Sequence, residues 1–120
     1  MGIDTTFVSG QGETATPMIR YAEALLAYAE AAEELGKCDA AVLEKTIKPL
    51  RERAGVTYLA PSAIDPNFPD FGYTISANLQ EIRRERRSEL PLQGMRLDDL
   101  MRWRAHKLFQ GKRGGGAYFG

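Results

Sequence analysis

The stretch from Leu79 to Arg104, LQEIRRERRSELPLQGMRLDDLMRWR, constrains the fold more than any other part of the chain. Steps of three, four and four residues place four side chains of its first half on one helix face, namely Leu79, Ile82, Arg86 and Leu90. Arg86 is the one charge in this apolar stripe, and a buried guanidinium is costly unless it reaches solvent or a carboxylate. The rest of the chain is therefore expected to supply what this helix packs against.

A helix is predicted earlier in the chain, from about Pro17 to Leu35. Thr16 can cap its start, proline is favoured at a first helical position, and Gly36 can end it in a left-handed conformation. One face carries small or aliphatic side chains that let a second helix approach closely, and these are Ala22, Leu25, Leu26, Ala29 and Ala32. This face is typical of helix packing.

The same helix repeats the letters YAEA after seven residues, close to two helical turns. Glu23 and Glu30 are the equivalent acidic residues of the two repeats, and both flank the small-residue face. We therefore expect Arg86 to be a structural anchor that pairs with Glu23 or Glu30. Tyr21 and Tyr28, the repeated tyrosines, are expected to pack between helices or along their seam.

A second helix is predicted from the capping residue Asp39 to about Arg53 or Ala54, with Gly55 as its stop. Its apolar stripe consists of Leu43, Ile47, Leu50 and Ala54. Pro49 lies inside this pattern, so a kink or a 3₁₀ turn is expected there. The connection to the preceding helix is short, which predicts an antiparallel αα-hairpin.

Residues 56–75 form a proline-rich loop that is longer than compact domains usually leave without a role. Ser76 can cap a third helix that ends at Pro91, and a fourth helix should follow with Asp98 and Asp99 in its first turn. The last turn of this helix is expected to hold the cations Arg102, Arg104 and Lys107. One side of the helix is expected to be lined by Leu97, Leu100, Met101, Arg104 and Leu108.

No strand pattern occurs, so the predicted fold is all-α: an αα-hairpin plus two further helices. The predicted organisation is a flexible lead-in over residues 1–15, a helical domain over residues 16–110 and a glycine-rich tail over residues 111–120. No apolar run approaches the roughly 20 residues that span a bilayer. Residues 1–12 are polar and lack an apolar h-region, so they are not expected to be a signal peptide.

The charges of the chain balance, with 16 basic and 16 acidic residues, so composition gives no bias toward nucleic acid or anionic lipid. The arginine run of residues 83–87 is typical of a nucleic-acid patch when it stands alone. Here Glu81, Glu85 and Glu89 interleave with it at four-residue spacing. An ion-paired helix face is therefore favoured over a nucleic-acid site.

Catalytic chemistry finds little support in these residue types. His106 is the only histidine, lies among cations near a helix end, and is expected to be a surface or capping residue. Asp65 and Asp70 are typical turn formers beside prolines rather than a glycosidase pair. The lone Cys38 cannot form an internal disulfide, and no cluster has metal-ligand spacing. We expect no enzyme, no metal and no cofactor.

The loop over residues 56–75 carries three aromatic residues that are the candidate ligand-binding residues: Phe68, Phe71 and Tyr73. Aromatic faces on a proline-stiffened loop can stack on the apolar face of a sugar ring. The alternative is that they fold back as a lid over the helical core, as aromatic loop residues commonly do. Trp103 is expected in the core.

Three blocks of the sequence occur in a recognisable order: IRYAEALLAYAEAAEELG, LRERAGV, and the stretch from Leu79 to Arg104. Together they resemble the C-terminal half of the SusD/RagB family over residues 17–109. The resemblance implies a tetratricopeptide-like helical scaffold and a parent protein anchored by lipid in the outer membrane of Bacteroidetes. It also implies binding of a glycan or other nutrient at the cell surface, passed on to a SusC-like TonB-dependent transporter.

The sequence departs from the family pattern at several points. Cys38 lies in a helix connection and cannot replace the lipid-bearing cysteine of the family, which is expected upstream. Pro91 follows the EL dipeptide where the family usually has a small or hydrophobic residue. The aromatic sugar platform of the starch-binding prototype lies outside the matched blocks, so no ligand residue carries over by position.

A second function class remains open beside the glycan-binding one. The αα-hairpin and the alanine-rich face are also typical of a helical-repeat module that binds a protein, such as the transporter itself, and no sugar. As part of a larger scaffold, the chain would expose apolar helix faces and is expected to self-associate through them.

Overall fold

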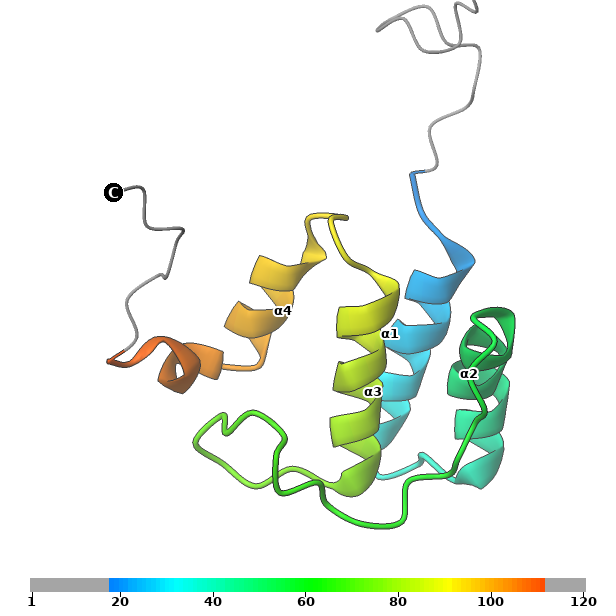
Figure 1. Ribbon diagram of the computed structural model, residues 1–120, viewed down its shortest axis with the longest axis horizontal. Helices are drawn as coiled ribbons and strands as arrows, with labels where there is room; N and C mark the ends of the chain where they lie inside the picture. Colours follow the sequence, from blue (N-terminus) through cyan, green and yellow to red (C-terminus); the bar gives the residue numbers. More distant parts are fainter. Residues whose placement is uncertain (1–17, 112–120) are drawn as a thin grey trace, which may run out of the picture.

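The computed structural model describes residues 18–111 and places all of their regular structure in helices (Figure 1). In order these are α1 (Tyr21–Glu34), α2 (Ala40–Arg53), α3 (Ala77–Glu89), α4 (Met95–Arg102) and the 3₁₀ helix η2 (Ala105–Phe109). The prediction of an all-α fold is confirmed. Within residues 18–111, no helix combines the length and the apolar character that crossing a membrane requires.

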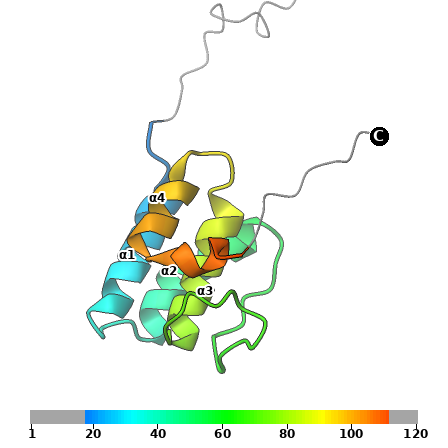
Figure 2. The same ribbon diagram turned by 90° about the vertical axis from the view of Figure 1, so that its left-hand side faces the viewer.

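Helix α1 is central, because it packs against both α2 and α3 (Figures 1 and 2). The predicted alanine-rich face provides this contact, with Ala22, Leu26 and Ala29 buried. Helix α2 adds Leu43, Ile47 and Leu50, and α3 adds Ile82 and Leu90, to form one apolar core. Ala54, predicted in the stripe of α2, is exposed beyond the end of the helix.

Helix α1 begins at Tyr21 rather than at Pro17, and Thr16 and Pro17 lie outside the described residues. Arg20 holds the N-cap position in an extended conformation, from which its guanidinium reaches Glu89 at 2.6 Å. The prediction that the tyrosines pack between helices is wrong, since Tyr21 and Tyr28 are 78% and 57% exposed. In each YAEA unit the first alanine, Ala22 or Ala29, faces inward. The tyrosine before it is turned by about 100° about the helix axis and therefore points outward.

Helix α2 has the predicted ends. The Asp39 side chain accepts a hydrogen bond from the Val42 amide at 2.9 Å, and Gly55 follows the helix with a φ of +72°. Pro49 lies inside the helix without breaking it, and no 3₁₀ turn occurs there, so the expected 3₁₀ start is wrong. The carbonyl that loses its partner belongs to Lys45, an exposed residue, so water can satisfy it.

The predicted fourth helix is divided in two. Helix α4 ends at Arg102, Arg104 adopts a left-handed φ of +48°, and η2 follows. The expected single last turn of Arg102, Arg104 and Lys107 is therefore wrong. The break allows Trp103 to turn into the protein, where it is buried as predicted. Leu97 and Met101 of α4 point outward instead of lining a packed side.

Arg86 lies where α1, α3 and α4 meet, and it is only 7% exposed. Its guanidinium makes two hydrogen bonds to Asp99, from Nε at 2.9 Å and from Nη2 at 2.8 Å. The nearer oxygen of Glu30 is 3.7 Å away. Among residues 18–111 Glu23 forms no ion pair. The carboxylate closest to Arg86 is that of Asp99 in α4, a residue that was not expected to pair with it.

Glu30 is also held by two groups at the end of α4. Arg102 Nη2 donates to it at 2.9 Å, and the indole N–H of Trp103 donates to its other oxygen. We call Glu30, Arg86, Asp99, Arg102 and Trp103 the buried charge cluster. Each buried carboxylate in it has more than one donor, which is the condition under which charges tolerate burial. The cluster joins α4 to the first and third helices.

The predicted ion-paired face of α3 exists, and its partners lie largely on other elements. Arg51 of α2 bonds Glu85 at 3.0 Å and also contacts Glu81, while Arg53 reaches Glu89 at 2.6 Å. Arg84 supplies the one pair within α3 itself, with Glu81. The interleaved glutamates of α3 therefore bind mainly the hairpin.

Replacing Arg86 by alanine should destabilise the protein by about 3 kcal/mol, because it removes the buried cation between Glu30 and Asp99 and leaves these two carboxylates only the half-exposed Arg102. Urea unfolding of the full chain measures this change. Arg53→Ala is the matched control, since its side chain is 60% exposed and surface pairs contribute about 0–1 kcal/mol. Equal stability of Arg86→Ala and the wild-type protein would contradict the role assigned to the cluster.

Candidate ligand pocket

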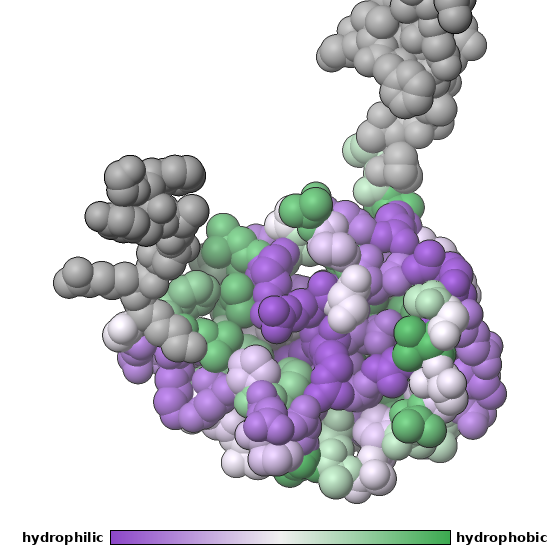
Figure 3. Space-filling model, in the orientation of Figure 1, coloured by the Kyte–Doolittle hydropathy of each residue, from purple (hydrophilic) through white to green (hydrophobic). Residues whose placement is uncertain are grey.

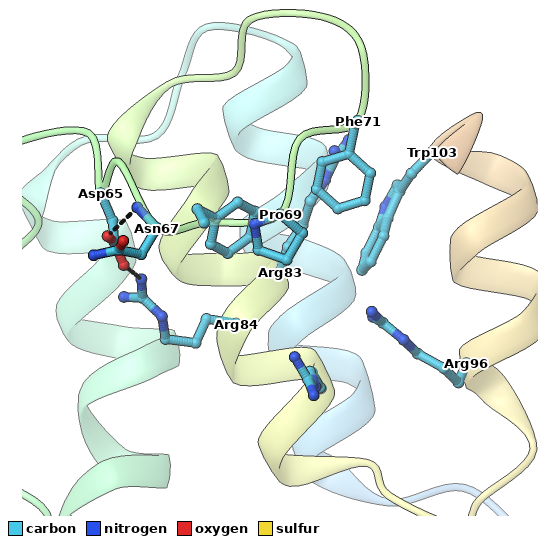
Figure 4. A pocket seen from close by; sticks show the side chains of 10 residues that line it. Asp65, Asn67, Pro69, Phe71, Arg83, Arg84, Arg96 and Trp103 are labelled. Carbon is cyan, nitrogen blue, oxygen red and sulfur yellow. Dashed lines mark hydrogen bonds and ion pairs between the residues drawn. The ribbon is translucent and has the colours of Figure 1, made fainter. Parts of the chain in front are cut away.

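The long loop before α3 folds back toward α4 and encloses a pocket of about 190 Å³ between them (Figure 4). The residues that line the pocket come from the loop, from α3 and from α4 with the Trp103 that follows it, and they are Asp65, Asn67, Phe68, Pro69, Phe71, Arg83, Arg84, Arg87, Arg96 and Trp103. Pockets for drug-sized ligands measure roughly 300–1,000 Å³. This pocket can therefore hold one ring or one substituent of a larger ligand.

One wall of the pocket is an aromatic cluster. The Phe71 and Trp103 rings meet edge to face with centroids 6.1 Å apart (Figure 4). The Phe68 ring centroid lies 5.9 Å from that of Phe71. Tyr73 extends the cluster at 6.2 Å from Phe71, and its hydroxyl donates to the Trp103 carbonyl. Such pairs contribute about 0.5–1.5 kcal/mol each beyond area burial. The cluster fixes the loop against the residue where α4 ends.

Arg83 is buried against this cluster, with 5% of its surface exposed. Its guanidinium carbon lies 4.7 Å from the Trp103 ring centroid and 5.1 Å from that of Phe71. Nη1 donates to the Tyr73 hydroxyl at 3.0 Å, and Nε has no hydrogen-bond partner. Ring faces stabilise a desolvated cation. Arg83 is thus held by π-systems, and no carboxylate of residues 18–111 lies within ion-pair distance.

The other arginines of the pocket differ in whether a carboxylate neutralises their charge. Arg84 is paired with Asp65 at 2.6 Å and with Glu81 (Figure 4). Arg87 and Arg96 have no carboxylate of residues 18–111 within 4.0 Å. Burial lowers the pKa of the Arg96 guanidinium, and the neighbouring positive charge of Arg87 lowers it further. The pocket therefore has a net positive lining.

The three aromatic candidates take different positions. Phe68 is half-buried in the pocket wall, Phe71 is 3% exposed, and Tyr73 is 44% exposed but lies outside the lining. Arg83 lies over the rings of Phe71 and Tyr73. Phe71 is left with little ring surface for a sugar to stack on, whereas Tyr73 keeps an exposed part. This arrangement is that of the folded-back lid. Of the anchor residues, Glu30 and Arg86 lie together in the buried charge cluster, and Glu23 lies at its edge.

Sequence reasoning did not single out Arg83, Arg87, Arg96 and Trp103 as neighbours in one pocket. The interleaved glutamates explained the arginine run as a whole. A closer signal was available: Arg83 and Arg87 are four residues apart on one helix face. The two arginines between them, Arg84 and Arg86, are paired with carboxylates. Arg83 and Arg87 are not paired with a carboxylate of residues 18–111.

Arg87 and Arg96 also line a second hollow, of about 350 Å³, next to Leu90 and Pro91. Two further hollows contain arginines that are already paired. The groove between α2 and α3 contains the Arg51 pairs with Glu81 and Glu85. A hollow beside α1 contains the Arg102 pair with Glu30. Within residues 18–111, neither hollow presents an unpaired arginine, and the hollow beside α1 carries the unpaired carboxylate of Glu23.

The acidic and nucleophilic residues hold structural positions. Asp65 accepts from the Asn67 amide, and Asp70 accepts from Gly72 and Lys107, whose hydrogen bond lowers the pKa of Asp70. Burial, with Glu33 nearby, raises the pKa of the Cys38 thiol to about 11. Residues 18–111 contain no group of three or more metal-ligating side chains close enough to share an ion.

Replacing Tyr73 by phenylalanine keeps the ring and removes the hydroxyl between Arg83 and the Trp103 carbonyl. We expect a loss of about 1–2 kcal/mol in unfolding free energy, because a buried cation and a carbonyl each lose a partner. Tyr21→Phe is the control, since Tyr21 is exposed and lies away from the loop. If both variants unfold at the same urea concentration, the hydroxyl does not anchor the loop.

Comparison with known proteins agrees with the blocks of sequence described above. The SusD family profile matches residues 3–119, almost the whole chain of 120 residues. No curated protein and no solved structure matches the chain significantly. A match of this extent, on an all-helical fold, identifies the chain as a member of the SusD family.

Proposed function

We propose that this chain is part of a protein that captures a glycan or another nutrient at the outer-membrane surface. The observation that carries the proposal is the SusD family match over residues 3–119. The SusD family is a cell-surface nutrient-binding family, and its members are binding proteins rather than enzymes. The pocket beside Phe68 and Trp103 is the candidate place for part of the ligand.

The partner in this proposal is a SusC-like TonB-dependent transporter, which would receive the nutrient. Attachment to the outer membrane would be through a lipid anchor, as the resemblance to the lipoproteins of Bacteroidetes implies. The balanced charge of the chain, 16 basic against 16 acidic residues, supports no nucleic-acid role.

The pocket suggests how such a ligand would be bound. Arginine N–H groups of Arg87 and Arg96 can donate to ligand oxygens, and Phe68 with Pro69 supplies an apolar wall. Stacking on Phe71 is not favoured, because that ring is buried under Arg83. Hydrogen bonding by guanidinium groups would therefore contribute more than ring stacking.

Trp103 is the only tryptophan of the chain and lines the pocket, so its fluorescence reports on occupancy. Titration with a panel of oligosaccharides should change the emission with at least one of them. Phe68→Ala should weaken that ligand about 10-fold, since burying part of an aromatic side chain is worth about 1–2 kcal/mol.

Phe109→Ala is the control for this titration, because Phe109 is exposed and outside the pocket. A panel that leaves the emission of the wild-type protein unchanged would contradict sugar binding at this pocket. Equal weakening by Phe68→Ala and Phe109→Ala would place the ligand elsewhere.

A second candidate function is supported by a separate observation. Leu97, Met101 and Phe109 are exposed on α4 and η2, around a shallow apolar hollow of about 400 Å³. Figure 3 shows hydrophobic surface gathered over α4, next to the hydrophilic band above α3. An exposed apolar patch is typical of a protein contact. The alternative proposal is thus a helical-repeat interaction module, with the transporter as one possible partner and no sugar ligand.

The apolar patch should make the chain self-associate when no partner covers it. Light scattering should show the average mass rising with protein concentration. Met101→Glu should lower the association constant obtained from these data about 10-fold, because self-association would then bury a charge. Leu35→Glu is the control at an exposed leucine of α1. A constant monomer mass over a wide concentration range would contradict the prediction.

A further inference from the structure

Most arginines of residues 18–111 are paired with carboxylates, and those without such a pair are Arg104 and three that line the pocket. Six arginines form ion pairs with carboxylates of residues 18–111, and they are Arg20, Arg51, Arg53, Arg84, Arg86 and Arg102. Arg83, Arg87 and Arg96 line one pocket, and no such pair joins them to the described residues. The one carboxylate in the lining, Asp65, is already bonded to Arg84.

Arg83 is the most deeply buried of these three arginines. It is more than nine-tenths buried, and its Nε hydrogen points to no acceptor. The aromatic rings and the Tyr73 hydroxyl compensate part of its desolvation. They supply no negative charge, so the attraction of a buried guanidinium for an anion remains unused.

Arg87 and Arg96 bring two more positive charges to the same space from different helices. Arg96 extends from α4 over the Trp103 ring, with its guanidinium carbon 5.5 Å from the centroid (Figure 4). Its pKa is lowered by burial and then by repulsion from Arg87. An anion between these two side chains would remove that repulsion and gain two charge-assisted hydrogen bonds.

We propose that the pocket binds the carboxylate of an acidic sugar, with Arg83, Arg87 and Arg96 as the groups that face the charge. A carboxylate matches the planar fork of a guanidinium. The sugar ring that bears it would contact Phe68 and Pro69 on the apolar side. A volume of about 190 Å³ accommodates one such ring. This assignment rests on the proposed nutrient-binding function and narrows its ligand class to uronate-containing glycans.

The test compares a galacturonic acid trisaccharide with the corresponding neutral galactose trisaccharide, by calorimetry and by Trp103 fluorescence. The acidic sugar should bind at least 10-fold more tightly, and raising the salt concentration from 50 to 500 mM should weaken it alone. Arg96→Gln and Arg87→Gln should each reduce its affinity about 10-fold. Both side chains are at least partly exposed, so these variants should fold.

Arg53→Gln is the matched control, because it removes the same charge from an exposed site outside the pocket, and it should leave the affinity unchanged. Equal affinity for the two sugars would overturn the acidic-ligand assignment and leave the proposed function standing. An equal loss in Arg53→Gln and Arg96→Gln would also overturn it, since general charge would then explain the binding. Binding of neither sugar would overturn the acidic-ligand assignment, whereas the proposed function is decided by the titration with the oligosaccharide panel.

Discussion

The guanidinium of Arg86 is the group on which the arrangement of this protein depends. It lies in the interior with Asp99 and Glu30, at the junction of three helices. Charges removed from water are tolerated only when their partners are held in place. Asp99 comes from α4 and Glu30 from α1, so satisfying Arg86 also fixes where α4 can lie. The indole of Trp103, bonded to Glu30, extends the same constraint to the end of α4.

The pocket is a consequence of that constraint. Because Trp103 is fixed by the buried charge cluster, its ring offers a surface against which Phe71 and the long loop pack. Arg83 and Arg86 are three residues apart on α3 and reach burial in different ways. Arg86 is neutralised by carboxylates, whereas Arg83 is covered by aromatic rings. Aromatic rings do not neutralise the positive charge of Arg83, so this charge remains available to a ligand. This is the physical basis for proposing an acidic ligand.

Local signals in the sequence predicted much of the fold. Asp39 and Ser76 cap helices as expected, and the small residues around Leu26 face the neighbouring helices, because capping and periodicity depend on near neighbours. The break at Arg104 was missed, since it depends on Trp103 turning inward toward a distant glutamate. The prediction that Asp99 lies in the first turn of the fourth helix is wrong, because α4 begins at Met95 and only Asp98 lies in its first turn. The partner of Asp99, Arg86, is known only once α4 is placed against α3.

The site was less accessible to sequence reasoning than the fold. The aromatic loop is predicted from its sequence, but the burial of Phe71 under Arg83 is a contact between the loop and α3 that no local pattern encodes. The run of arginines was interpreted as one ion-paired face, although Arg84 and Arg86 are paired and Arg83 is not. Separating them requires knowing which side of α3 faces the hairpin and which faces the pocket.

The most direct test of the central claim is hydrogen exchange at the Trp103 indole, which gives a single resonance because the chain has one tryptophan. The claim is that the buried charge cluster holds α4 and Trp103 in place. It predicts an indole proton that exchanges far more slowly than in an unfolded chain, and that loses this protection in Arg86→Ala while α1 and α2 remain helical. Exchange at the unfolded rate in the wild-type protein would contradict it.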